Sequence, residues 1–397
     1  MTIDTNTRGV AAAERIAVID ALRGFALAGI LFANSLYWSG WDFMMPAQST
    51  ALFGAGATTQ LWFWHKLLVD GKFYTIFSML FGLGFALQLA RLEARGADGI
   101  AIFRRRLLVL LGFGLVHLML IWDGDILTLY ALLGLLLPFF RHASERTILA
   151  WAAGCLLLPL VAAPLFVALG WAPWNALFML ADAINPATGS KLTDFVGWLQ
   201  RPDWGSFFQW KSTGWVFRIW MLLDNWRLPK VLGMMLLGMW AGRRLVAGTL
   251  LGDRRLLVRV LVVGLLVGLP ASWLYAVTPG VNQSSLGSML GTVPMGLAYA
   301  AAIVLAWGWA KPVLGVLVAP GRMALTNYLS QTLLGIAIYY GVGFGLVGHA
   351  PPLTVLAIAA AIFAMQIAWS HLWLARFRQG PMEWLWRRLT YGGRVAG

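Results

Sequence analysis

Charged and polar residues recur at a fixed spacing within the most apolar parts of this sequence. Arg23 and Asn34 are eleven residues apart, and Arg106 and His117 repeat that spacing. In a helix, at about 100° and ~1.5 Å per residue, an eleven-residue step returns to almost the same face and advances by ~16 Å. Two parallel helices would each present an Arg at one rim and a polar group at matching depth. This pattern suits an amphipathic anionic ligand whose phosphates bind Arg while its reactive end reaches an imidazole.

Each of these residues also has a simpler interpretation. Asp20 lies three residues before Arg23 on the same face, so the two charges can pair. Arg23 could equally be a positive-inside anchor whose guanidinium reaches the lipid head groups. His117 could be a core histidine that bonds to a backbone group or to Asn34, because buried polar groups need partners.

Further polar residues lie in or beside apolar segments. Asn327 and Gln331 share a helix face at a four-residue step, and their alternative role is hydrogen bonding between helices. Lys72 begins an apolar segment. Its amine is expected either to bind a ligand or only to extend to the membrane–water interface. Asp125 is placed to cap the helix that follows it, and a role in a functional site comes second to this capping role.

The composition requires membrane helices to position these residues. Hydrophobic residues make up 60% of the 397, charged residues only 12%, and the mean hydropathy is +0.74. The sequence therefore predicts an all-α polytopic membrane protein with about ten transmembrane helices, in a range of nine to twelve, plus interfacial helices. The net charge of +14 then reflects Lys and Arg in cytoplasmic loops rather than nucleic-acid binding, and the single Cys155 excludes an internal disulfide framework.

The predicted spans cover about 18–37, 71–91, 106–122, 126–140, a segment ending near 170, 231–242, 256–277, 288–310, 322–347 and 353–374. Residues 1–14 are predicted to be a disordered tail, and 171–228 an outer segment too polar to span, which forms a lid or interfacial helices. An amphipathic helix is predicted from Pro381. Clusters of Arg in alternate loops place both termini in the cytoplasm.

Several segments, in this order along the chain, resemble one bacterial family. They lie within 20–34, 71–84, 117–127, 321–331 and 380–387, with motifs such as Asp-Ala-Leu-Arg-Gly, Gly-Lys-Phe-Tyr, His-Leu-Met-Leu-Ile-Trp-Asp-Gly-Asp, Thr-Asn-Tyr and Gly-Pro-Met-Glu-Trp. Together they resemble the YeiB family of bacterial inner-membrane proteins, whose C-terminal half is a domain of unknown function. The resemblance divides the chain into an acyltransferase-like half, 1–228, and a YeiB-type half, 229–397.

The first predicted span also resembles that of a wider transmembrane acyltransferase superfamily, which includes heparan-alpha-glucosaminide N-acetyltransferase. In the related group that O-acylates surface sugars, a histidine stands where this chain has Asn34. The lysosomal enzyme has Asn there and a histidine shortly beyond, for which His65 is the next candidate. His117 belongs to the YeiB-type pattern and is our first choice for the base.

The resemblance implies transfer of an acyl group, acetyl first, from cytoplasmic acyl-CoA to a hydroxyl or amine of a cell-envelope glycan or small molecule. The expected catalytic residues are His117, Asn34 and Asp125, and the expected acyl-CoA ligands are Arg23, Arg106, Asp20 and Lys72. The residues expected to bind the acceptor are Arg322, Asn327, Tyr328, Gln331, Trp122 and His65. Outer Trp side chains could stack on a sugar, or form the aromatic belt of the interface.

Three other functions remain compatible with the sequence. A transporter or flippase for an amphipathic anion would use the same polar core without chemistry, a b-type haem protein would use His117 with a second histidine, and a structural membrane partner would need neither. We expect no haem and no metal, because the five histidines are scattered without ligand spacing. The expected partners are the lipid bilayer and the acceptor, and a homodimer is compatible with these features.

Overall fold

The computed structural model describes residues 5–184 and 195–392, with side chains from residue 16 onward. In chain order the elements are α1 (Thr5–Trp38), η1 (Trp41–Phe43), α2 (Pro46–Phe53), α3 (Ala55–Trp64), η2 (His65–Val69), α4 (Lys72–Glu93), α5 (Gly99–Val116), η3 (His117–Ile121), α6 (Leu127–Gly134), η4 (Leu137–Phe140), α7 (Glu145–Ala168), α8 (Asn175–Ile184), α9 (Phe195–Leu199), α10 (Trp204–Asp224), α11 (Arg227–Val246), α12 (Arg254–Val277), α13 (Leu286–Leu314), η6 (Gly315–Leu317), α14 (Val318–Arg322), α15 (Ala324–Tyr339), α16 (Pro352–Leu374) and α17 (Pro381–Tyr391). Every regular element in this part of the chain is helical.

Six of the described helical segments are long and apolar enough to cross a membrane. They are Ile16–Trp38, Ala55–Glu93, Glu145–Ala168, Arg254–Val277, Leu286–Arg322 and Pro352–Leu374. The predicted fold class, an all-α polytopic membrane protein, is confirmed. The remaining predicted spans fall on helices that are shorter or carry more charge, so the count of about ten stays a prediction.

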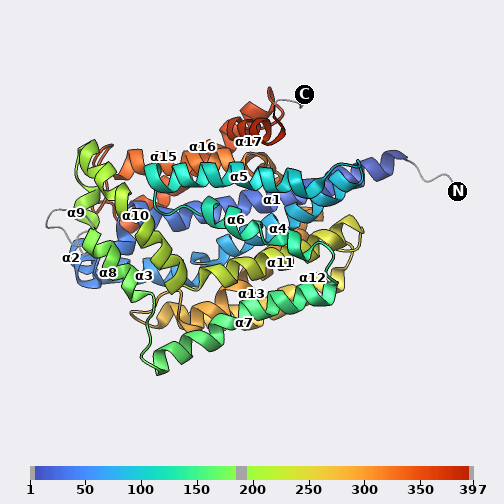
Figure 1. Cartoon of the computed structure of the whole chain (residues 1–397). Helices are drawn as coiled ribbons and strands as arrows, with labels where there is room; N and C mark the ends of the chain where they lie inside the picture. Colours follow the sequence, from blue (N-terminus) through green and yellow to red (C-terminus); the bar gives the residue numbers. More distant parts are fainter. Residues whose placement is uncertain (1–4, 185–194, 393–397) are drawn as a thin grey trace.

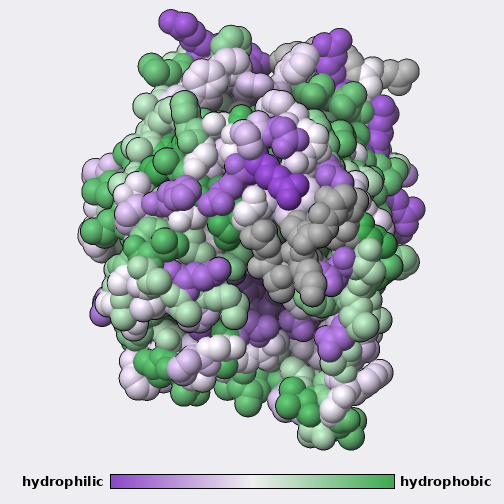
Figure 2. Space-filling model, turned by 90° about the vertical axis from the view of Figure 1, so that its left-hand side faces the viewer, coloured by the Kyte–Doolittle hydropathy of each residue, from purple (hydrophilic) through white to green (hydrophobic). Residues whose placement is uncertain are grey.

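Most of the long helices run lengthwise through the bundle (Figure 1). Helix α1 begins at one end of it, which we call the basic end because α4 and α11 finish toward it, with Arg91 and with Arg243 and Arg244 in their last turns. At the opposite end, which we call the distal end, lie α2, α3, α8 and α9. Figure 2 looks onto the distal end, where hydrophilic residues gather around the centre and line a hollow.

Two expectations about the start of the chain and the segment 171–228 differ from the structure. The predicted tail is helical from Thr5, because alanine-rich residues extend α1; residues 1–4 lie outside the described part. The segment 171–228 is not only a polar cover, since α10 packs against η3 and buries Lys211 and Arg218. These cations are seven residues apart, so they share one helix face and find partners inside the bundle.

The predicted amphipathic helix at Pro381 is present as α17, and it is anchored to the bundle by hydrogen bonds. Trp386 Nε1 donates to the Arg106 carbonyl at 2.9 Å, and Glu383 accepts from the backbone N–H groups of Leu325 and Thr326 at 2.7 and 3.1 Å. Burial raises the pKa of the Glu383 carboxyl, against the lowering effect of its hydrogen bonds from Thr326. The helix thus closes over the starts of α15 and α5 instead of lying only on the membrane surface.

Two glycines on α4, Gly82 and Gly84, differ in how closely a neighbouring helix approaches them, and only Gly82 is needed for close packing on α11. A Cβ atom at Gly82 would overlap the Met235 carbonyl, whereas one at Gly84 would meet only Arg23 Nη2, at 3.9 Å. We therefore expect Gly82→Ala to destabilise the protein by about 1–3 kcal/mol, because the two backbones must move apart. Gly84→Ala is the matched control and should change stability little. Unfolding in detergent measures both, and equal effects of the two variants would contradict this assignment.

Candidate functional site

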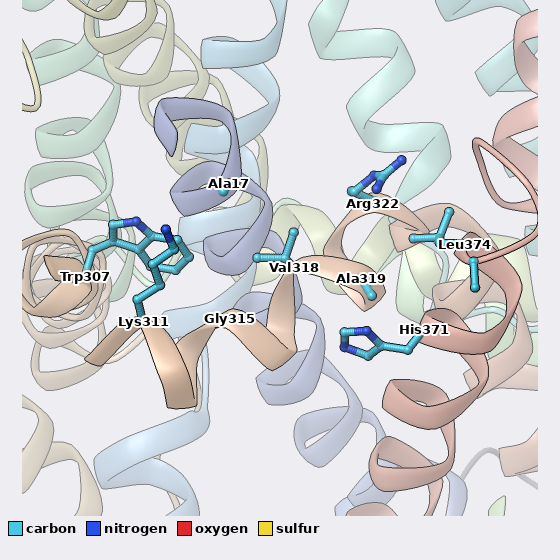
Figure 3. A pocket seen from close by; sticks show the side chains of 10 residues that line it. Ala17, Trp307, Lys311, Gly315, Val318, Ala319, Arg322, His371 and Leu374 are labelled. Atoms are coloured by element: carbon cyan, nitrogen blue, oxygen red, sulfur yellow. The ribbon is translucent and has the colours of Figure 1, made fainter. Parts of the chain in front are cut away.

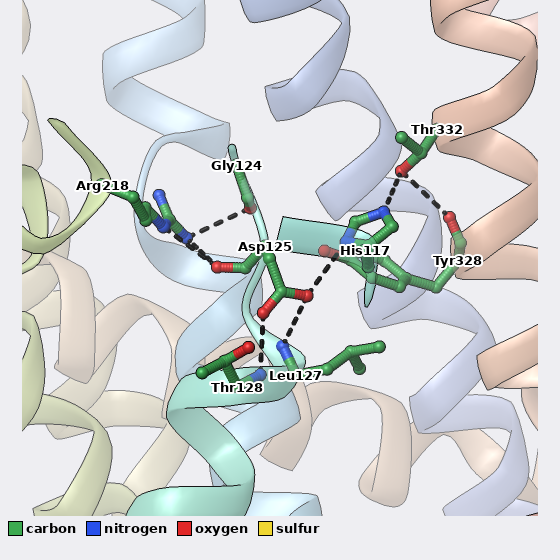
Figure 4. Close-up of polar contacts among 8 residues, drawn as sticks. All are labelled: His117, Gly124, Asp125, Leu127, Thr128, Arg218, Tyr328 and Thr332. Carbon is green, nitrogen blue, oxygen red and sulfur yellow. Dashed lines mark hydrogen bonds and ion pairs between the residues drawn. The ribbon is translucent and has the colours of Figure 1, made fainter. Parts of the chain in front are cut away.

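His117 is the centre of a buried polar site near the distal half of the bundle. It stands where α5 gives way to the single π-helical turn η3, and its exposed fraction is 1%. The imidazole Nδ1 lies 2.9 Å from Asp125 Oδ1, and Nε2 lies 3.1 Å from Thr332 Oγ1 on α15 (Figure 4). A carboxylate beside Nδ1 orients the ring so that Nε2 is the nitrogen that exchanges a proton with a hydroxyl. Single π turns are frequent at functional sites.

The loop before α6 holds Asp125 from two directions. Its carboxylate accepts from the backbone N–H groups of Leu127 and Thr128 at 3.1 and 2.7 Å, so it caps α6 as predicted. From the other direction, Arg218 on α10 donates to the carbonyls of Gly124 and Asp125 at 3.1 and 2.6 Å (Figure 4). The cap and the imidazole therefore hold the carboxylate, and Arg218 holds the backbone of the same loop, before any substrate binds.

Two aromatic side chains that we expected in the acceptor site lie beside the imidazole. The Tyr328 ring is centred 5.3 Å from the His117 ring, and the Trp122 ring is 6.1 Å from it. Both residues are buried, and neither Tyr328 OH nor Trp122 Nε1 has a hydrogen-bond partner within the described part of the chain. An unsatisfied buried donor costs ~1–3 kcal/mol. A polar partner, either ordered water or a bound molecule, would satisfy these two groups.

A buried ion pair lies on the other side of Trp122. Lys211 Nζ donates to Asp123 Oδ1 at 2.8 Å, and both side chains are 1% exposed. Tyr37 OH also donates to the Asp123 carboxylate. The pair joins α10 to the loop that carries Asp125, two residues further on, so it supports the site from outside it.

The residues predicted beside His117 on other helices have different neighbours. Asn34 is partly buried on α1, and no hydrogen bond joins it to His117, whose two nitrogens bond to Asp125 and Thr332. The suggested His117–Asn34 bond is therefore wrong, because the π turn η3 redirects the ring toward α15. Sequence reasoning also missed Thr332, although it follows directly after Gln331 in a polar run.

Asn327 and Gln331 bind α15 to α16. Asn327 Nδ2 donates to Ser370 Oγ at 2.9 Å, and Gln331 Nε2 donates to Gln366 Oε1 at 2.8 Å. Both residues are buried. These contacts match the hydrogen bonding between helices that was the alternative to a role in the site.

The basic end brings together several of the residues predicted to bind acyl-CoA. Arg23 pairs with Asp20 at 2.5 Å, as their three-residue spacing predicts. Arg106 donates to Gln88 Oε1 at 3.0 Å, and its guanidinium stacks on the Trp386 ring at 4.0 Å. Lys72 does not belong to this group, because it is the first residue of α4, which runs antiparallel to α1 and starts at the distal end.

A cavity of about 440 Å³ opens at the basic end between α1, α13, α14 and α16 (Figure 3). Its walls are mostly apolar, and the polar side chains among its lining residues are Trp307, Lys311, Arg322 and His371. Arg322 also donates to the Arg378 carbonyl at 3.0 Å. An apolar cavity of this size with cations at its rim is typical of a site for part of an anionic small molecule.

His65 and Lys72 meet at the distal end, among other cations. Lys72 is fully buried and donates to the Lys66 carbonyl at 2.5 Å, whereas neither ring nitrogen of His65 has a partner in the described structure. Among the described residues, no group of three or more His, Cys, Asp and Glu could hold a metal ion.

Comparison with known proteins places these sites in a family. A family model described as "Protein of unknown function (DUF418)" matches residues 241–393. The uncharacterized protein YxaH of Bacillus subtilis is 34% identical over 95% of this chain and 94% of its own length. YeiB of Escherichia coli, also uncharacterized, is 32% identical over 97% of this chain and 98% of its own length. The chain therefore belongs to the YeiB family of membrane proteins.

Proposed function

We propose that this protein is a membrane-embedded acyltransferase that moves an acyl group, acetyl first, from acyl-CoA to a hydroxyl or amine. The observation that supports this most is the buried pair of His117 and Asp125. Asp125 lies beside Nδ1 of the imidazole, and the other nitrogen, Nε2, already faces the hydroxyl of Thr332 at 3.1 Å. An imidazole held by a carboxylate on one nitrogen and by a hydroxyl on the other is the arrangement of a general base for an oxygen nucleophile.

In the proposed reaction, His117 Nε2 takes the proton of the acceptor hydroxyl or amine as its oxygen or nitrogen attacks the thioester carbonyl. The new acyl C–O or C–N bond forms, the C–S bond breaks, and the proton passes from the imidazole to the leaving thiolate to give CoA. Asp125 stabilises the imidazolium that forms between the two steps. The unpartnered Tyr328 OH is placed to donate a hydrogen bond to the charge that develops on the carbonyl oxygen.

The donor would enter at the basic end, which we place in the cytoplasm of a bacterium, with the protein in its inner membrane. Arg residues gather at this end, as the positive-inside rule requires for a cytoplasmic face. Arg23 and Arg106, with Arg322 at the rim of the cavity, would bind the phosphates of CoA. Arg106 and His117 are eleven residues apart on one helix, a separation of ~16 Å that the extended arm of an acyl-CoA can cover.

The first test is thermal unfolding of the detergent-solubilised protein with acetyl-CoA, longer acyl-CoAs and CoA. A ligand at a hundred times its Kd stabilises the native state by ~2.7 kcal/mol, so the melting temperature should rise. We expect Arg23→Ala to remove the shift and His117→Gln to keep it, because only the first removes a phosphate ligand. Arg254→Ala, which replaces an exposed arginine at the start of α12, is the matched control and should keep it.

Comparison of Arg23→Ala with Arg322→Ala then assigns the donor site within the basic end. If Arg322→Ala alone removes the shift, the cavity between α13 and α16 binds the nucleotide end of CoA, which still supports the proposal. Absence of a shift with every acyl-CoA, in protein that unfolds cooperatively, would overturn it. Electrogenic flux of an amphipathic anion into vesicles without acyl-CoA would then identify a transporter.

A further inference from the structure

Four cations converge at the distal end, at a place that the proposed reaction does not use. Lys66 belongs to η2, Lys72 begins α4, and Arg227 and Lys230 lie in the first turn of α11. We call these four residues the distal cationic cluster. Lys72 and Lys230 are 0% and 3% exposed, and Lys66 and Arg227 are partly buried. Burial of a cation is costly unless an anion compensates it.

The hydrogen bonds of the cluster go mainly to neutral groups. Lys66 Nζ donates to the Val281 carbonyl at 3.1 Å, and Lys72 Nζ donates to the Lys66 carbonyl. Arg227 Nη2 donates to Gln283 Oε1 at 2.5 Å, and Lys230 Nζ is 3.5 Å from the Gln283 carbonyl. Among the described residues, no carboxylate lies within 4.0 Å of these four cations. Each ammonium has three donors, so most of their hydrogen-bonding capacity is unused.

Asp70 is a carboxylate whose charge interacts with all four cations, but it offsets only part of the charge of the cluster. Asp70 accepts from Tyr275 OH at 2.6 Å and from Gln283 Nε2 at 2.5 Å, which are both neutral donors. Gln283 therefore turns its amide toward Asp70 and its carbonyl toward Arg227, and it separates the anion from the cation. One carboxylate against four cations leaves a local excess of positive charge.

The backbone adds to this positive potential. Helices α4 and α11 both begin at the cluster, at Lys72 and Arg227, and they are 22 and 20 residues long. The first N–H groups of a helix are unpaired and its N-terminus carries partial positive charge, so both helix starts favour an anion.

Two side chains beside the cluster, one partly buried and one buried, have polar atoms without a hydrogen-bond partner within the described residues. They are His65, at both ring nitrogens, and Tyr74, at its hydroxyl. Tyr74 is 6% exposed, and the Arg227 guanidinium lies 4.3 Å from the centre of its ring. Native proteins rarely leave such groups unsatisfied, so they indicate a bound group that accepts and donates hydrogen bonds.

The cluster lies within electrostatic range of a residue that supports the candidate active site. Arg218, which holds the carbonyls of Gly124 and Asp125, lies close enough to Arg227 for their charges to interact. Both the cluster and the pair of His117 and Asp125 lie toward the distal end, which is hydrophilic at its centre and hollowed (Figure 2). A molecule with an anionic group in the cluster could place a hydroxyl toward His117.

We propose that the distal cationic cluster binds a phosphate group, and that this phosphate belongs to the acyl acceptor. Its oxygens would bridge Lys72, Lys230 and Arg227, whose charge-assisted hydrogen bonds to phosphate are the strong ones. The identification of the phosphate with the acceptor rests on the proposed function, whereas the binding of phosphate does not. The phosphate is part of a soluble sugar phosphate or of an anionic lipid head group, and the two sources differ in how they reach the protein.

The test measures the melting temperature in an uncharged detergent with increasing inorganic phosphate or pyrophosphate, at constant ionic strength. We expect a rise that saturates, and an at least tenfold higher apparent Kd in Lys72→Met and in Arg227→Gln. The matched control is Arg254→Gln, which removes an exposed cation at the start of α12. It should bind phosphate as the unmodified protein does.

The melting temperature of Lys72→Met in phosphate-free buffer is the control for folding. It should not fall below that of the unmodified protein, because the substitution removes a buried cation that no paired anion compensates. Equal phosphate affinity in Lys72→Met, Arg227→Gln and the unmodified protein would overturn the proposal. So would a melting temperature that rises neither with phosphate at any concentration nor with an anionic lipid. A rise only in micelles that contain phosphatidylglycerol, lost in the same two variants, would support it with a lipid head group as the source.

This test and the acyl-CoA test can fail separately. If acyl-CoA raises the melting temperature but neither phosphate nor an anionic lipid does, the phosphate site is refuted and the acyltransferase proposal stands. A phosphate effect at the cluster without any acyl-CoA shift refutes the acyltransferase and leaves the anion site in place.

Discussion

His117→Gln should lower the rate of acyl transfer by a factor of ~10²–10⁴, which is the usual contribution of a general base. Glutamine is similar in size and polarity, yet it cannot take a proton from the acceptor. The measurement is release of CoA thiol from acetyl-CoA in the presence of membrane extracts or glycan acceptors. The acyl-CoA melting shift should persist in this variant, which shows that it is folded and binds the donor.

Asp125→Asn should have an effect of similar order for a different reason. The single side-chain oxygen of asparagine can still accept from one of the two N–H groups, of Leu127 or Thr128, and so cap α6, but it no longer stabilises the imidazolium of His117. Thr332→Val tests whether the threonine hydroxyl takes part in the reaction or only holds the place of the acceptor. We expect the rate of transfer to fall less than tenfold, because the hydroxyl bonds to His117 Nε2 only until the acceptor arrives. Full activity in His117→Gln would refute the assignment of the base.

Lys211→Met should destabilise the protein by about 3–5 kcal/mol, the largest stability effect that we expect. The substitution leaves Asp123 without its cation, although the carboxylate is 1% exposed and still accepts from Tyr37. The free energy of unfolding in detergent, from denaturant or thermal curves, measures the loss. Activity should fall with it, since Asp123 is two residues from Asp125.

The double variant Lys211→Met/Asp123→Asn should recover most of this loss, because it no longer buries an unpaired charge. The surface pair of Arg244 and Asp253, whose side chains are 29% and 34% exposed at a distance of 3.6 Å, provides the control. Arg244→Met should cost less than ~1 kcal/mol, because solvent screens that pair. A Lys211→Met variant as stable as Arg244→Met would mean that water reaches Asp123.

Local features of this protein could be predicted from the sequence because helix geometry alone determines them. The pairing of Asp20 with Arg23 follows from their three-residue spacing, and the start of α17 follows from Pro381. Asp125 was recognised as a cap because its carboxylate accepts from N–H groups only two and three residues further along the chain, in the first turn of α6. The apolar composition likewise determined the fold class, since a chain this hydrophobic must fold in a bilayer.

The partners that make His117 a candidate base were decided by tertiary structure. Thr332 is 215 residues from His117, and Arg218 is 93 residues from Asp125. Helix periodicity places a side chain on a face, but only the packing of α5, α10 and α15 brings these faces together. The same holds for the distal cationic cluster, whose residues come from η2, α4 and α11. The sequence by itself determined the membrane bundle and its local pairs, whereas the contacts between helices that build both sites depend on which faces pack together.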